Sequence, residues 1–471
     1  NAPKIIFKTF HDAKIPYYFG FSFFYLDFFQ YFCTLNIILN NYHRMKKLFL
    51  AALMMSLTLA VNAQSGMNSP YSQWGLGLLS DQTSGFNAGM NGVGLGFHEH
   101  NQVNYINPAS YSSVDSLTFL FDAGISGQIS NFNENGVKKN AKNANLDYVV
   151  AAFRAFRHMG VSFGILPFSN VGYNYSVSGW VNEETKEDYY TNTYEGDEGF
   201  HQAYVGLGYM PVKGLSVGAN ISYLWGKYNR TVTNSYSNSY INSLSRNYSA
   251  RVGSYKLDFG VQYTQRVSKK DWVTLGLTYS PKHNLGASAD MYQVKTNAMD
   301  GSLDTTSFSV DKAFELPHMV GAGLMWNHAA QWKVGLDYTI QMWKDLKAPV
   351  FDGRDYVLKD GCYSNRHKIN LGAQYCYGEY SRRFLQRVQY RAGVSYTTPY
   401  VKINGQDGPK EFAVSAGFGI PIVNSYNSRS FLNISGQWVK RSAKDLIKEN
   451  IFRINIGFTF NEDWFKKWKM Q

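Results

Sequence analysis

Hydrophobic and polar residues alternate along most of this chain. Between residues 215 and 225 every odd-numbered side chain is apolar, whereas Ser216, Gly218, Asn220 and Ser222 occupy the even positions before Leu224. Residues 332–342 and 452–460 repeat the pattern. A period of two predicts β-strands with one apolar and one polar face, and no twelve-residue window shows a convincing helical stripe. The chain is therefore expected to be all-β.

Two classes of β-protein show this alternation. A soluble sandwich turns its apolar face to a core, whereas an outer-membrane barrel turns it to lipid and its polar face to the lumen. The polar faces here are rich in Gly, Ser, Asn and Thr with scattered charges, which favours the barrel. Aromatic residues at strand ends also favour it, because barrels carry aromatic belts at the membrane interfaces. These strand-end residues are Trp225, Trp332, Trp343 and Trp438.

The spacing of the strands is the strongest argument for a closed barrel. We expect fourteen strands, at about 115–131, 144–157, 159–181, 200–211, 214–231, 249–267, 272–285, 314–327, 331–345, 366–379, 385–400, 411–422, 430–441 and 451–460. Short connections near residues 158, 212–213, 268–271 and 328–331 alternate with long ones, expected at 132–143, 182–199, 232–248, 286–313, 346–365 and 401–410. An even strand count with one short-turn end fits a barrel inserted from the periplasm.

The segments outside the predicted barrel, 115–460, have different characters. Residues 45–63 read as a secretory signal peptide, with Lys46 and Lys47 before an apolar run and small residues near the cut. We interpret residues 1–44 as translated upstream sequence; the alternative is a membrane helix over 19–39. Residues 64–114 are Gly- and Asn-rich and are expected to plug the lumen, with a disordered leader as the alternative. Residues 461–471 form a basic, aromatic periplasmic tail.

Charge and motifs exclude several functions. The net charge of +12 is spread along the chain without a Lys/Arg tract, so nucleic acid is not an expected partner. Ser162 lies in a G-x-S-x-G pattern, but a strand continues through it, so no enzyme is predicted. The stretch 98–100, His-Glu-His, lacks an identifiable third ligand, and no metal or cofactor is expected. The acidic residues of 182–199 are expected in a solvated loop.

Four stretches resemble the FadL family, also called OmpP1-type outer-membrane proteins. GMNGVGLG at 89–96, followed by Asn107-Pro108-Ala109, is similar to the family's plug signature, with Asn91 where glycine is usual. GVSFGILPFSN at 160–170 resembles its third strand, with Ser169 replacing a glycine. The stretches 209–223 and 314–323 resemble its fifth and eighth strands. The likeness covers the plug and about half the barrel.

The resemblance implies a fourteen-stranded barrel with an N-terminal hatch in the outer membrane of a Gram-negative bacterium. It assigns Asn107, Pro108 and Ala109 to the hatch, and Pro167 and Phe168 to a lateral gate in the third strand. The implied function is passive uptake of a hydrophobic small molecule, such as a long-chain fatty acid, with release into outer-membrane lipid. The alternative is a non-transporting barrel subunit of an outer-membrane secretion or assembly complex, with outer-membrane proteins as partners.

Overall fold

The computed structural model describes residues 68–134, 136–423 and 429–462, which fall within one compact unit. The predicted upstream segment 1–44, the signal peptide 45–63 and most of the tail, 463–471, lie outside the described residues. No helix among the described residues is long and apolar enough to cross a membrane.

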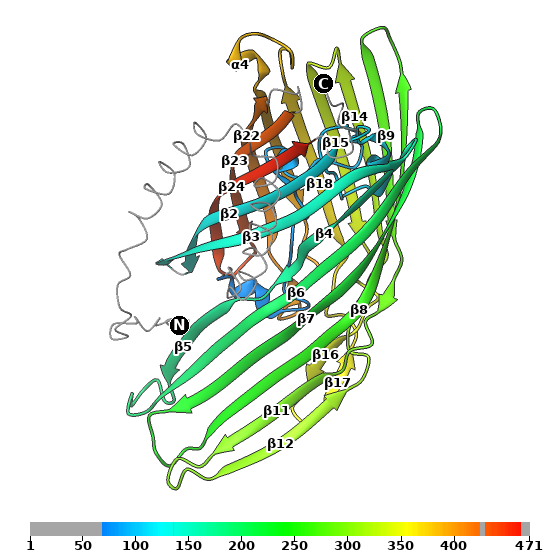
Figure 1. Cartoon of the computed structure of the whole chain (residues 1–471). Coiled ribbons are helices and arrows are strands. Elements are labelled where there is room, and N and C mark those ends of the chain that lie inside the picture. The colour runs from blue at the N-terminus through cyan, green and yellow to red at the C-terminus, as the bar shows by residue number, and fades with distance from the viewer. Residues whose placement is uncertain (1–67, 135, 424–428, 463–471) are drawn as a thin grey trace, which may run out of the picture. The chain divides into compact units, whose positions relative to one another are not determined.

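Fourteen antiparallel strands close into a barrel, as predicted (Figure 1). In order around the wall they are β2 (Phe119–Glu134), β3 (Val137–Phe156), β4 (Met159–Asn170), β6 (Tyr189–Val212), β7 (Leu215–Tyr236), β8 (Ser243–Arg266), β9 (Asp271–Ser280), β14 (Met319–His328), β15 (Trp332–Gln341), β18 (Arg366–Tyr375), β19 (Gln389–Thr397), β22 (Lys410–Val423), β23 (Arg429–Ser442) and β24 (Lys448–Glu462). The last strand pairs with the first from Phe119↔Glu462 to Asn133↔Lys448, so the sheet has no open end.

The remaining elements are short. β1 (Leu78–Leu79), β5 (Tyr173–Trp180), β11 (Ala289–Thr296) and β12 (Leu303–Val310) extend the main sheet, and three small two-stranded sheets lie between barrel strands. These sheets pair β10 (His283–Asn284) with β13 (Glu315–Leu316), β16 (Ala348–Phe351) with β17 (Tyr356–Lys359), and β20 (Lys402–Ile403) with β21 (Gln406–Asp407). The helices are η2 (Pro70–Gln73), α3 (Gly85–Ala88), η3 (Pro108–Ser113) and α4 (Phe384–Arg387).

The outer face of the barrel is apolar between two aromatic belts, as expected for a lipid-facing surface. The belt toward the long-loop end comprises Tyr223, Tyr255, Tyr279, Tyr338, Tyr396, Phe412, Trp438 and Phe452. The belt toward the short-turn end comprises Tyr209, Tyr263, Trp272, Trp326, Trp332, Tyr390 and Phe418. On β8 the two belts are about 26 Å apart along the strand, the same order as the apolar band of such barrels. Trp332 and Trp438 are confirmed as belt residues.

The prediction for Trp343 was wrong. Its side chain is 1% exposed and packs beside Tyr363 and Tyr400 in a large apolar cluster within the long-loop half of the molecule. The sequence correctly places Trp343 just after the end of β15, but its indole is buried in this cluster and does not face lipid.

Most of the predicted long loops are strands instead. β2 and β3 meet in a tight turn near residue 136, and β6 begins at Tyr189, so Glu195, Asp197 and Glu198 belong to a strand and not to a solvated loop. Beyond the long-loop belt, β5, β11, β12 and the adjoining parts of β6, β7 and β8 form one continuous sheet, the outer sheet (Figure 1). Its faces meet water and other side chains, so they lack the apolar alternation that lipid imposes.

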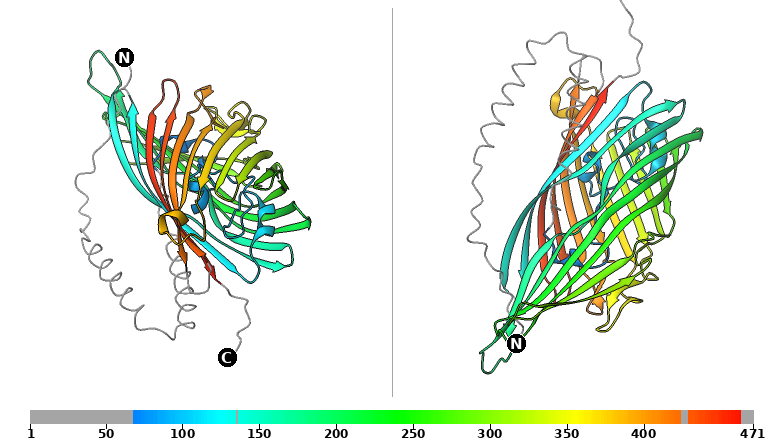
Figure 2. Two further views of the ribbon diagram at one scale, coloured as in Figure 1. Left: turned by 90° about the horizontal axis from the view of Figure 1, so that it is seen from above. Right: turned by 60° about the horizontal axis from the view of Figure 1, so that its bottom comes forward.

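Residues 68–114, the luminal segment, lie inside the ring of strands (Figure 2). Phe86, Met90 and Val93 are fully buried, and Met90 contacts the inner faces of β18 and β19 at Gly372 and Gly393. This segment supplies much of the buried apolar surface that a barrel of this width needs inside.

Candidate functional site

The luminal segment fits against the wall because inward-facing glycines make room for it. Gly160, Gly208, Gly218 and Gly260 are direct partners across β4, β6, β7 and β8. A Cβ at Gly218 would lie 2.4 Å from the carbonyl carbon of Pro108, and one at Gly276 would lie 1.9 Å from the oxygen of Leu95. Such distances are far below van der Waals contact, so a side chain at either position would displace the segment.

The three residues assigned to the hatch sit at this close contact. Asn107 caps η3 by accepting a hydrogen bond from Ala109 N, and its Nδ2 donates to Leu95 O at 2.9 Å and to Val261 O at 3.3 Å. Pro108 is buried, and Ala109 is 0% exposed. Residues 107–109 therefore tie two stretches of the luminal segment to the wall at β8.

The side chains of residues 98–100 point to three different partners. His98 Nδ1 lies 2.7 Å from Gln262 Oε1. Glu99 forms an ion pair with Lys333 at 2.6 Å, and His100 Nδ1 lies 2.7 Å from Asp115 Oδ2. Their divergence makes them anchors of the luminal segment, not a common ligand set. Ser162 is likewise part of the wall, because its Oγ lies 2.9 Å from Ala151 O and 2.8 Å from the Tyr204 hydroxyl.

The wall is interrupted beside Pro167 and Phe168. β3 and β4 pair only from Val149↔Ile165 to Phe156↔Met159. β3 then continues along β2 to Val137, and in the described part of the chain no ladder joins residues 137–148 to β4 or β5. A register shift against β6 follows Pro167, so the strand expected at 159–181 divides into β4 and β5.

The luminal segment occupies the edge that β3 leaves. Leu78 and Leu79 in β1 pair with Asn170 and Ser169, and Ser80 N donates to Phe168 O at 3.0 Å. Phe168 is 7% exposed and its ring belongs to the same apolar cluster as Trp343. The predicted gate residues therefore lie at the interruption, but they are covered from within.

Three residues that sequence reasoning missed hold this cover in place. Gln82 has a left-handed backbone, with φ of 53°, and its Nε2 donates to Pro167 O at 2.7 Å. Asp81 reaches across the lumen to Lys368 at 2.9 Å and to Arg453 at 3.5 Å. We call residues 80–82 the strap. Isolated polar residues in a Gly/Ser-rich stretch gave no signal for this role, because their partners lie hundreds of positions away.

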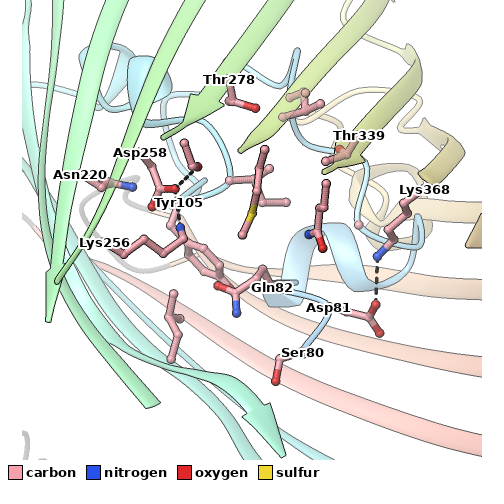
Figure 3. A pocket seen from close by; sticks show the side chains of 18 of the residues that line it. Ser80, Asp81, Gln82, Tyr105, Asn220, Lys256, Asp258, Thr278, Thr339 and Lys368 are labelled. Carbon is pink, nitrogen blue, oxygen red and sulfur yellow. Dashed lines mark hydrogen bonds and ion pairs between the residues drawn. The ribbon is translucent and has the colours of Figure 1, made fainter. Parts of the chain in front are cut away.

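A cavity of about 180 Å³ lies against the strap, and its lining combines charged and polar side chains with apolar ones (Figure 3). The charged residues that line it are Asp81, Lys256, Asp258, Asp337, Arg366 and Lys368. Lys256 pairs with Asp258 as Lys368 does with Asp81. The oxygens Asp337 Oδ1, Asn370 Oδ1 and Gln202 Oε1 are buried without a donor among the described residues. Such a lining suits water or a hydroxylated solute better than a hydrocarbon.

Comparison with solved structures shows the FadL-type fold. The CymD monoaromatic hydrocarbon channel matches with 17% identity and a TM-score of 0.52, covering 82% of this chain and 98% of that one. A Pseudomonas aeruginosa FadL homologue matches with 11% identity and a TM-score of 0.58, covering 82% and 99%. The Pseudomonas putida toluene transporter TodX matches with 15% identity and a TM-score of 0.56, covering 82% and 100%. At these identities the likeness establishes the fold alone.

Comparison at the level of sequence gives the family. No curated protein matches the chain. A family model described as BamG matches residues 45–471, which include every described residue of the barrel and of the luminal segment. The chain therefore belongs to the BamG family, and it folds as a FadL-type barrel.

Proposed function

We propose that this protein is a non-transporting barrel subunit of an outer-membrane secretion or assembly complex in a Gram-negative bacterium. One observation carries the proposal: the lumen beside the interruption at Pro167 is crossed by a charged strap and lined by ion pairs. A barrel without a usable apolar path can still serve as a rigid, membrane-anchored support.

Passage of a hydrophobic molecule would require this arrangement to open. The strap would have to give up the ion pairs of Asp81 and the hydrogen bond from Gln82 to Pro167. Each hydrogen bond to a charged group contributes about 1.5–3 kcal/mol, and an apolar solute would replace none of them. Burial of the solute would also remove water from the cavity's charged side chains. The apolar cluster around Trp343 fills the route above the strap with the protein's own side chains.

The outer sheet supplies surface for partner proteins. β8 continues from the belt residue Tyr255 to Ser243, about 40 Å further along the strand. In the described residues β5 pairs with β6 alone, which leaves an edge that a partner strand can extend. Large apolar side chains are exposed near the far end of this sheet: Trp180, Tyr189, Tyr240, Met299 and Leu303. Lipid would surround the barrel below.

Uptake of hydrophobic small molecules is the second candidate, and the interruption beside Pro167 favours it. Two of the similar structures are a monoaromatic hydrocarbon channel and a toluene transporter. In this alternative Asn107, Pro108 and Ala109 act as the hatch, Pro167 and Phe168 as the lateral gate, and the solute is long-chain and fatty-acid-like. The strap would then have to move during each passage.

A disulfide that fixes the luminal segment to the wall separates the two functions. Leu79 and Ser169 are direct partners between β1 and β4, so Leu79→Cys with Ser169→Cys places two thiols within bonding reach. We expect the oxidised variant to retain its outer-membrane protein partners, measured by mass spectrometry after native purification. We also expect wild-type and locked protein to give the same hydrocarbon and fatty-acid uptake in reconstituted vesicles.

Each single-cysteine variant and the chemically reduced double variant serve as controls for this lock. Uptake by the wild-type protein and by the reduced double variant that stops when the double variant is oxidised would refute the scaffold function and establish transport. Purification of the native protein without any stoichiometric protein partner would also contradict the scaffold.

A further inference from the structure

One connection at the short-turn end differs from the others. The turns at 157–158, 213–214 and 329–331 contain two or three residues, whereas residues 376–388 join β18 to β19 and include α4. We call residues 377–388 the rim foot. Its exposed apolar side chains are large: Tyr377 (54% exposed), Tyr380 (84%), Phe384 (50%) and Leu385 (68%). Arg382 and Arg383 between them are also exposed.

The rim foot bends toward the outer side of the wall. The hydroxyl of Tyr390 donates to Leu385 O at 3.2 Å, and Tyr390 is an outward-facing belt residue whose ring lies edge-on to Phe418. A second contact closes the loop, because Gly378 N donates to Gln386 O at 3.1 Å. α4 consequently overhangs the end of the strands (Figure 1). The foot is continuous with the lipid-facing belt.

Its chemistry matches a phospholipid surface. Aromatic and aliphatic side chains next to arginines are typical of segments that lie in a membrane interface. Guanidinium groups bind phosphates through paired hydrogen bonds, while their stems and the neighbouring apolar groups reach the acyl chains. A turn that met only water would not gain from exposing both Phe384 and Leu385.

We propose that the rim foot docks into the adjacent leaflet of the membrane and binds the phosphates of anionic phospholipids. Phe384 and Leu385 enter the acyl region, and Arg382 and Arg383 hold the headgroups. This docking is independent of whether the barrel transports a solute or supports partners. A periplasmic protein is the competing occupant, and the experiment below distinguishes it.

The test uses a bimane fluorophore on the full-length protein. Cys33→Ser and Cys362→Ser remove two thiols, and Cys376, which is 3% exposed, remains. Leu385→Cys then carries the label, with Ser239→Cys on the outer sheet as the matched exposed site. In nanodiscs containing brominated phosphatidylcholine we expect strong quenching at position 385 and none at 239. Equal access of aqueous iodide to both labels, without bromine quenching, would overturn the proposal.

The arginines are tested by titrating the labelled protein in detergent with short-chain phosphatidylglycerol. Each basic residue near an anionic lipid surface strengthens binding by about fivefold, so Arg382→Gln with Arg383→Gln should raise the midpoint by about 25-fold. Lys269→Gln with Lys270→Gln, an exposed pair on another turn of the same end, should leave it unchanged. An unchanged midpoint in the arginine variant, or a stoichiometric protein partner that only this variant loses, would refute lipid docking.

Discussion

Asp337, on the inner face of β15, fixes the luminal segment through the segment's backbone. Its Oδ2 accepts hydrogen bonds from Gly94 N at 2.7 Å and from Leu95 N at 2.9 Å, and the residue is 2% exposed. Asp337→Ala removes both charge-assisted bonds and leaves two buried N–H groups unpaired. At about 1.5–3 kcal/mol for each bond, the docking of residues 94–97 should weaken by about 3–6 kcal/mol.

Hydrogen exchange followed by mass spectrometry measures this loss. The amide of Phe97 is the reporter, because it donates to Gly94 O and does not itself touch Asp337. Since 1.4 kcal/mol is a factor of ten, its exchange should accelerate by about 10²–10⁴ in Asp337→Ala. Resistance of the folded barrel to unfolding by sodium dodecyl sulfate without boiling should remain, because the fourteen-strand ladder is untouched.

Asn370→Ala is the matched control. Asn370 is the direct cross-strand partner of Asp337, it is similarly buried, and its Oδ1 has no donor in the part of the chain that the structure describes. Its removal should change the Phe97 exchange rate by less than about tenfold. Equal acceleration in both variants, or no acceleration in Asp337→Ala, would refute the conclusion that this carboxylate fixes the segment.

Two further predictions concern the same contact surface. Gly276→Ala should also accelerate hydrogen exchange in the luminal segment, because the new Cβ would overlap the backbone oxygen of Leu95. Gly127→Ala should not, because a Cβ there would have nothing within 4 Å. Identical exchange in the two variants would contradict the close fit between the segment and the wall. Burial is the largest single influence on the pKa of Asp81 and raises it. The charges of Lys368, Arg453 and Arg366 and the hydrogen bond from Lys368 together outweigh burial and hold the pKa of Asp81 well below its usual range. The strap's ion pairs should therefore be fully present above about pH 4 and be lost as the pH falls further. The loss would be measured as faster proteolysis at residues 78–84, and Asp81→Asn should abolish this pH dependence. Protection from proteolysis that stays constant into strong acid would refute the role of Asp81.

The predicted architecture followed from one regularity. Side chains such as Val217 and Leu336 face lipid while Gly218 and Asp337 face the lumen, so lipid on one side and a packed interior on the other impose the alternation that the sequence shows. All fourteen barrel strands were predicted for this reason. The inward glycines were also visible as members of the polar face, although their role in admitting the luminal backbone was not.

Predictions failed where neither face meets lipid. The first part of β6, from Tyr189 onward, has partners on both sides and a mixed outer surface, so period two does not mark it as a strand. Trp343 and Phe168 could be placed near strand ends or a proline, but not assigned to one buried cluster, because that cluster unites residues from 76 to 401.

The sequence by itself determined a closed, lipid-facing barrel of fourteen strands. Only the tertiary structure decided that Asp81 spans the lumen, that β1 covers the break beside Pro167, and that charged groups line the remaining cavity. The physical reason is the distance along the chain between interacting residues. The alternation of apolar and polar side chains is set by neighbours along one strand. The ion pairs of Asp81 and the covering of the break by β1 depend on residues that only closure of the barrel brings together.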